Sequence, residues 1–296
     1  MSIKQAIRKV SHFPFVYRPF DTLLALLSSG LTDQHFLRKL IPSNEEYDKN
    51  TLRYCTRDNI RYCLDLNDYQ AWLIYFYFET DSSSHVLKYV KPGDVVIDIG
   101  GNIGQTALQV ATKVTEKGKV ISFEPYPDTY EKFKNNLSLN PAINNVELIT
   151  YGLGDKPGLF EMFQACNTNS GANRISLSHG SILEGEEAIN VITLDSFIES
   201  RRLNKIDLIK LDVEGFEMKV LRGAGSTIDH YKPVLFIEVD DANLKAQGDS
   251  VKDIFSYCKD FNYDVMDIGT GEMVKDYQAL ANRHTDILCH YSNPIN

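Results

Sequence analysis

The chain has 296 residues, of which 43% are hydrophobic and 24% charged, which predicts a soluble globular protein: one large domain with an appendage, or two small domains. Its net charge of −9 argues against a general nucleic-acid-binding protein. No stretch approaches the ~20 apolar residues of a membrane span, and no signal peptide is recognisable. The five cysteines are scattered without a C-x-x-C pair, so we expect free thiols, no zinc site and a cytoplasmic location.

Residues 1–40 differ from the rest of the chain in charge. They carry six basic and two acidic side chains, a balance of +4. Asp21 is placed to cap a helix through the apolar run 23–27, and Gly30 is placed to end it. We expect a helical appendage packed on the domain or a homodimerisation arm. Peripheral contact with an anionic membrane surface is the alternative.

Residues 50–90 form a lead-in to the main domain. The runs 52–55 and 60–66 are predicted to pair as a hairpin across residues 58–59. The dense aromatic run 69–78 is predicted to pack as core, with the mouth of an acceptor pocket as the alternative. A helix is expected over residues 82–90.

The chain is organised around residues 95–106. Residues 95–99 are apolar and β-branched, as in a buried parallel strand, and Asp98 interrupts them near the end. Gly100, Gly101 and Gly104 then allow a tight turn into a helix that presents free N–H groups.

This glycine turn differs from a dinucleotide fingerprint. It reads D-x-G-x-N-x-G, with Asn102 where G-x-G-x-x-G has its second glycine. An anion at Asp98 suits a ligand with cationic groups and hydroxyls. S-adenosylmethionine fits this description better than NAD.

A second acid follows at the expected distance. Residues 119–123 predict another buried strand, and Glu124 at its end is placed to accept hydrogen bonds from ribose hydroxyls. Asp155, in a glycine-containing turn after the strand 146–150, is placed to meet an adenine amino group. A plain turn residue explains Asp155 equally well.

Strands and helices alternate from residue 95 onward, which predicts a mostly parallel sheet with helices on both faces. The expected helices are 104–117, 127–139, 215–223 and 249–260, and the further strands are 159–163, 206–213, 233–239, 263–268 and 285–291.

Residues 167–174 form a polar loop with amides and hydroxyls suited to binding a polyol. His179 in the same region is a candidate base, although an exposed loop histidine is the simpler interpretation.

Carboxylates gather where two central strands end. Asp212 and Glu214 follow one strand, and Glu238, with Asp240 and Asp241, follows the next. Ligands bind at this edge in open α/β sheets. We predict that Asp212, Glu214 or Glu238 removes a proton from an acceptor hydroxyl. Binding of Mg²⁺ or Ca²⁺ by the same carboxylates is the alternative.

Taken together, these motifs resemble the FkbM-type methyltransferases over about residues 90–270. The motifs are D-I-G-G-N-I-G from Asp98, F-E-P around Glu124, G-L-G-D ending at Asp155, T-L-D from Thr193, and K-L-D-V-E-G-F-E from Lys210. The resemblance implies a class I (Rossmann-like) fold with a seven-stranded sheet. It also implies S-adenosylmethionine as methyl donor and a hydroxyl acceptor, often on a sugar or a polyketide.

By matching motifs, the donor would be held by Asp98, Gly100, Asn102, Gly104 and Glu124. We add Thr106 and Asp155 to this set. Gly101 stands where such motifs commonly have alanine, a mild departure.

The sequence therefore predicts an O-methyltransferase acting on a small molecule or glycan, with residues 1–90 as an N-terminal extension and 91–296 as the catalytic domain. Two alternatives stay open at this point. One is an NAD-dependent oxidoreductase on the same sheet, and the other is a non-catalytic methyltransferase-like scaffold.

Overall fold

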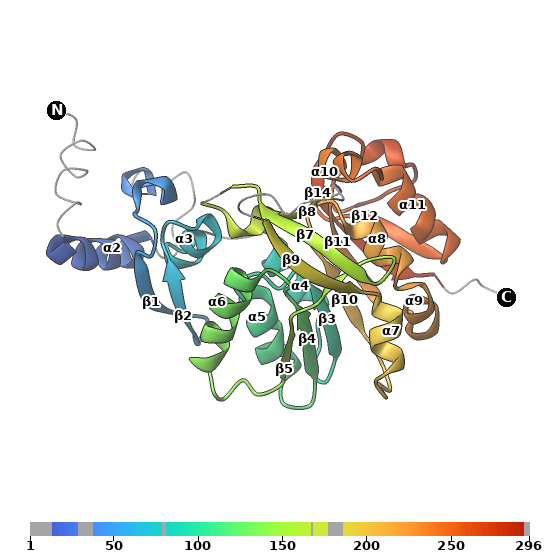
Figure 1. Cartoon of the computed structure of the whole chain (residues 1–296), viewed down its shortest axis with the longest axis horizontal. Helices are drawn as coiled ribbons and strands as arrows, with labels where there is room; N and C mark the ends of the chain where they lie inside the picture. The colour runs from blue at the N-terminus through green and yellow to red at the C-terminus, as the bar shows by residue number, and fades with distance from the viewer. Residues whose placement is uncertain (1–13, 29–37, 79–80, 167, 177–185, 293–296) are drawn as a thin grey trace. The chain divides into compact units, whose positions relative to one another are not determined.

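The computed structural model describes residues 14–28, 38–78, 81–166, 168–176 and 186–292. The chain forms two compact units (Figure 1). The first comprises Met1–Thr80 with Cys166–Gly171, and the second comprises Asp81–Ala165 with Ala172–Asn296.

The first unit is built on a two-stranded hairpin. Its β1 and β2 are antiparallel, and Asp58 and Asn59 between them have φ of 50° and 64°. Positive φ at both central residues is typical of a type I′ hairpin turn, so the predicted hairpin is confirmed. The elements of this unit are α2 (Pro14–Ser28), η1 (Arg38–Leu40), η2 (Asn44–Glu46), β1 (Leu52–Arg57), β2 (Ile60–Asp65) and α3 (Tyr69–Tyr75).

The helix α2 starts earlier than predicted. It begins at Pro14, a residue favoured in the first helical turn, so the prediction that Asp21 caps it is wrong. Asp21 lies inside the helix, fully buried, and accepts hydrogen bonds from the Arg53 guanidinium at 2.7 Å and the Tyr47 hydroxyl at 3.1 Å. Gly30 and residues 1–13 lie outside the described residues. Membrane contact and homodimerisation therefore stay predictions.

The aromatic run packs largely as core, as predicted. Tyr75 and Phe76 are buried, and their rings meet edge to face with centroids 5.0 Å apart. Trp72 stacks on Phe78 with centroids 4.6 Å apart.

The start of the polar loop belongs to this first unit. Asp68 caps α3 by accepting from Ala71 N, and its other oxygen accepts from Ser170 N at 2.7 Å. Thr168 O accepts from Tyr69 N at 2.8 Å. One side-chain and one backbone hydrogen bond thus fix Thr168 and Ser170 on the hairpin unit.

The second unit contains the predicted sheet. Its strand order is β13-β12-β14-β11-β10-β3-β4-β5, with β11, β10, β3, β4 and β5 mutually parallel and β14, β12 and β13 joined antiparallel (Figure 1). The strands are β3 (Val95–Ile99), β4 (Lys119–Phe123), β5 (Val146–Ile149), β10 (Leu208–Leu211), β11 (Val234–Asp240), β12 (Tyr263–Asp267), β13 (Glu272–Met273) and β14 (His284–Tyr291). The mixed, mostly parallel α/β fold is confirmed, with β13 as a two-residue addition at one edge.

Helices pack against this sheet along its length. Helix α5 contacts β3, β4 and β5, while α8 and α10 contact β11 and α11 contacts β12. The helices of this unit are α4 (Asp81–Tyr89), α5 (Gln105–Val114), α6 (Pro127–Ser138), α7 (Leu194–Glu199), α8 (Glu217–Arg222), α9 (Gly225–Tyr231), α10 (Asp241–Ala246) and α11 (Val251–Asp260). None of the helices that the structure describes is long and apolar enough to cross a membrane.

A second, four-stranded sheet was not predicted. Its order is β6-β9-β7-β8, with β6 (Gly152–Leu153), β7 (Gly158–Gln164), β8 (Asn173–Ser176) and β9 (Glu186–Ile192). Only β7 was recognised from the sequence. The short η3 (Ser170–Ala172) precedes β8, and η4 (Tyr277–Ala279) precedes β14.

Candidate functional site

The candidate site lies at one edge of the large sheet. Strands β3, β4, β10 and β11 are parallel, so the residues that follow them meet at the same edge, where open α/β sheets bind ligands. A polar row crosses the sheet just inside this edge. Lys210 is paired with Asp98, and Asp98 with Ser122, across three neighbouring strands.

The glycine turn packs closely against neighbouring parts of the protein. Gly100 has φ of 89°, and a Cβ there would lie 1.8 Å from the Asp212 carbonyl oxygen. Gly104 has φ of 91°, and a Cβ there would lie 2.3 Å from the Phe133 ring. Both positions require glycine because the turn packs directly on the end of β10 and on α6.

Glu124 is buried beneath this turn. Its Oε2 accepts from Asn102 N at 2.8 Å, and its Oε1 accepts from Tyr126 N at 2.9 Å. Burial raises the pKa of Glu124 to about 7, against the opposing effect of these hydrogen bonds. Each carboxylate oxygen retains a lone pair for a further hydrogen-bond donor.

Asp98 is buried at the centre of the polar row. Its Oδ2 accepts from Ser122 Oγ at 2.6 Å, while its Oδ1 lies 3.5 Å from Lys210 Nζ and has no hydrogen-bond partner among the described residues. Burial raises the pKa of Asp98, although the Lys210 ammonium opposes the rise.

The two other predicted donor residues lie on neighbouring elements. Thr106 is half-buried in the first turn of α5. Asp155 is exposed after β6, and its backbone runs beside Gly223 at the end of α8.

Lys210 links the glycine turn to the carboxylates, and the sequence reasoning gave it no role. Its Nζ lies 3.0 Å from Asp212 Oδ2 and donates to Gly100 O at 3.1 Å. Burial alone would lower the pKa of Lys210, but Asp212 and Asp98 raise it above its usual value. The sequence could have indicated this role, because Lys210 interrupts the apolar strand 208–211 and a buried amine needs anionic partners.

Asp212 and Glu238 are hydrogen-bonded to each other, and their pKa values are shifted in opposite directions. Burial raises the pKa of Asp212, but the Lys210 ammonium and the hydrogen bonds from Glu238 and Lys210 together outweigh it and hold that pKa below its usual range. The neighbouring Asp212 charge, together with burial, raises the pKa of Glu238 well above its usual range.

His284 completes this group and was not recognised from the sequence. Its Nε2 lies 3.1 Å from Glu238 Oε1, and its Nδ1 lies 3.4 Å from Asp240 Oδ2. The hydrogen bond to Glu238 raises the pKa of His284 to about 9. The feature that could have indicated His284 is its position at the start of β14. This strand is antiparallel to β11 and so begins at the site edge.

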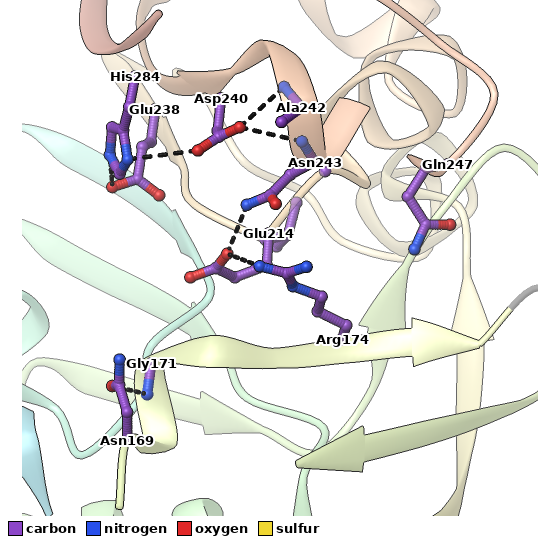
Figure 2. Close-up of polar contacts among 12 residues, drawn as sticks. Asn169, Gly171, Arg174, Glu214, Glu238, Asp240, Ala242, Asn243, Gln247 and His284 are labelled. Atoms are coloured by element: carbon purple, nitrogen blue, oxygen red, sulfur yellow. Dashed lines mark hydrogen bonds and ion pairs between the residues drawn. The ribbon is translucent and has the colours of Figure 1, made fainter. Parts of the chain in front are cut away.

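Glu214 lies in the turn after β10 with φ of 53°, a conformation that non-glycine residues rarely adopt. Its Oε2 accepts from Asn243 Nδ2 at 2.8 Å and lies 3.6 Å from Arg174 Nη2 (Figure 2). Burial and the Asp212 charge raise the pKa of Glu214 to about 7.

Two other acids of this edge hold the backbone. Asp240 caps α10 by accepting from Ala242 N and Asn243 N at 2.9 Å each. Asp241 is buried, accepts from Asn282 N at 2.8 Å and pairs with Lys245 at 2.7 Å. Asp241 therefore belongs to a structural hydrogen-bond and ion-pair network where β11 ends.

The structure gives no support to the metal alternative. Among the described residues, no group of three or more His, Cys, Asp or Glu side chains is arranged to hold a metal ion. His179 lies outside the described residues.

Comparison with known proteins identifies the domain. Residues 98–265 match the family described as "Methyltransferase FkbM domain". The hexuronic acid methyltransferase AglP of Haloferax volcanii is 32% identical over 145 residues, which cover 49% of this chain and 56% of that protein. The 2-O-methyltransferase NoeI of Sinorhizobium fredii is 26% identical over 168 residues, covering 52% of this chain and 66% of that protein.

A solved methyltransferase FkbM from Methylobacillus flagellatus has a TM-score of 0.45 and 14% identity, covering 95% of this chain and 61% of that one. The family match confirms the resemblance read from the sequence, the methyltransferase class and S-adenosylmethionine as the family's donor. It favours this class over the oxidoreductase alternative.

Proposed function

Because this chain belongs to the FkbM methyltransferase domain family, we propose that it transfers a methyl group from S-adenosylmethionine to a hydroxyl of a sugar or similar small molecule. The observation that carries this proposal is the extent of the family match. It begins at Asp98 and includes the glycine turn, Glu124 and the carboxylates after β10. Relatives named for hexuronic acid and for 2-O-methylation support a sugar-like acceptor.

The residues around the turn fit this donor. We assign Asp98, Gly100, Asn102, Gly104, Thr106, Glu124 and Asp155 to donor binding. Glu124 would accept hydrogen bonds from ribose hydroxyls, since both of its oxygens keep acceptor capacity. The Oδ1 of buried Asp98, which has no hydrogen-bond partner among the described residues, offers a further acceptor. When bound, S-adenosylmethionine supplies the electrophilic methyl group.

We assign proton removal from the acceptor hydroxyl to Glu214. A general base works best when its pKa lies near the working pH, and the pKa of Glu214 is about 7. Asp212 is the weaker base because Lys210 stabilises its charge. Glu238 is also a weaker candidate because His284 and Asp212 already engage its carboxyl group. A positioned base of this kind accelerates transfer by roughly 10²–10⁴-fold.

Calorimetric titration tests donor binding directly. The purified protein is titrated with S-adenosylhomocysteine and, separately, with NAD⁺, and Glu124→Ala serves as the site variant. We expect binding of S-adenosylhomocysteine that weakens in the variant, and no binding of NAD⁺. The reverse preference would contradict the proposal.

Acceptor specificity is then tested by incubating the protein with S-adenosylmethionine and a panel of hydroxylated sugars. Formation of S-adenosylhomocysteine together with an O-methylated product is the expected result. Donor binding without transfer to any hydroxyl of the panel would favour a non-catalytic scaffold.

A further inference from the structure

Arg174 is a cation with unused hydrogen-bonding capacity beside the proposed base. It lies on β8, its side chain is 32% exposed, and its closest charged partner is Glu214 at 3.6 Å (Figure 2). That distance is too long for a hydrogen bond. Its Nε is buried and has no partner among the described residues.

The buried Nε of Arg174, without a partner among the described residues, calls for a ligand. Arginine carries five N–H donors in a planar fork, and a buried donor without a partner is destabilising. Glu214 neutralises Arg174 incompletely, because with a pKa of about 7 it is only partly ionised at neutral pH. Arg174 therefore keeps a positive charge that Glu214 only partly balances, and an N–H group without a partner among the described residues.

The other cations of the site are already occupied. Lys210 contacts Asp212, Asp98 and the Gly100 carbonyl oxygen. His284 lies between Glu238 and Asp240. Of these three cations, all within the part of the chain that the structure describes, Arg174 is the one left to bind an external anion.

We propose that Arg174 binds a carboxylate of the acceptor, so that the acceptor class is hydroxylated carboxylic acids of the sugar-acid type. This inference rests on the proposed function, since it places the acceptor beside Glu214. The planar fork of a guanidinium matches a carboxylate through two parallel hydrogen bonds. A single guanidinium balances a monoanion, whereas a phosphate dianion would be repelled by the ionised Asp212.

The competing occupant of Arg174 is the carboxylate of the methyl donor itself. If Arg174 held the donor, its removal would weaken S-adenosylhomocysteine binding. If it holds the acceptor, its removal leaves that affinity unchanged and affects only the acidic sugar. The two assignments therefore differ in a directly measured quantity.

The test is calorimetric titration of protein saturated with S-adenosylhomocysteine. The three probes are glucuronate, glucose and glucose 6-phosphate, which differ in the group at carbon 6. The proteins are wild type, Arg174→Gln, the charge-conserving Arg174→Lys, and Arg202→Gln as a matched control. Arg202 is exposed in the segment that follows α7.

In the wild type we expect glucuronate to bind at least about tenfold more tightly than either other probe, as a charge-assisted hydrogen-bonded pair provides. We expect Arg174→Gln to abolish this preference, Arg174→Lys to retain part of it and Arg202→Gln to retain all of it. A wild type without preference for glucuronate, including one that binds none of the probes, overturns the proposal. So does an Arg174→Gln variant that keeps the preference or loses S-adenosylhomocysteine affinity. Failure of the wild type to bind S-adenosylhomocysteine at all would instead refute the proposed function.

Discussion

Replacing Glu214 by glutamine isolates its proposed role as the base. The substitution keeps the side chain's size and the strained backbone at φ of 53°, and its amide oxygen can still accept from Asn243. It removes the carboxylate that would take the hydroxyl proton. We expect the turnover rate to fall by about 10²–10⁴-fold, the usual contribution of a positioned base. S-adenosylhomocysteine affinity should be unchanged.

The pH dependence gives a second, independent measure. The pKa of Glu214 is about 7, and the base is active in its ionised form, so activity should rise with pH. The ionised fraction grows from about one tenth at pH 6 to about nine tenths at pH 8, which predicts a roughly ninefold increase in rate. Glu214→Gln should lose this rise along with most of its activity.

The assay follows S-adenosylhomocysteine production with the best acceptor of the sugar panel, at saturating donor. Glu272→Gln, an exposed carboxylate on β13, is the matched control and should behave as wild type. The assignment is refuted if Glu214→Gln keeps more than a third of the activity, or if the wild-type rate is flat between pH 6 and 8.

Three further predictions concern the donor site and the polar row. Hydrogen bonds from ribose hydroxyls would favour the ionised form of Glu124, whose pKa is about 7. The affinity for S-adenosylhomocysteine should therefore rise from pH 6 to pH 8, and binding should release protons. Calorimetry in buffers of different ionisation enthalpy measures this proton release. Lys210→Met leaves Asp98 and Asp212 without their buried cation and should lower the free energy of unfolding by about 3–5 kcal/mol in denaturant titrations. Gly100→Ala should abolish S-adenosylhomocysteine binding, because its Cβ would lie 1.8 Å from a carbonyl oxygen; wild-type affinity would contradict the described turn.

Features encoded by neighbouring residues were predictable from the sequence. The hairpin at Asp58-Asn59 follows from turn residues that tolerate positive φ, and the central strands follow from short apolar runs. The predicted helix start at Asp21 was wrong, and the structural hydrogen bonds of Asp241 were not predicted, for a common reason. Each carboxylate is buried against partners distant in sequence, Arg53 for Asp21 and the Asn282 backbone for Asp241.

The residues that the sequence reasoning missed depend on strand register. Lys210 reaches Asp98 because β10 and β3 pair with these two residues directly opposite each other. His284 reaches Glu238 because β14 runs antiparallel to β11 and starts at the site edge. Register between strands distant in sequence is set by the packing of the whole sheet, which no local pattern contains.

Lys210 also explains how one sheet edge can hold carboxylates with different protonation states. Its ammonium lies between Asp98 and the Gly100 carbonyl, which we assign to the donor side, and Asp212, which lies on the side that we assign to acid–base chemistry. By fixing the charge on Asp212, it makes Asp212 the anion that raises the pKa values of Glu214 and Glu238. Separating the pKa values of adjacent acids in this way is how proteins assign acid and base roles. A change at Lys210 should therefore shift the pH profile of catalysis as well as the stability of the fold.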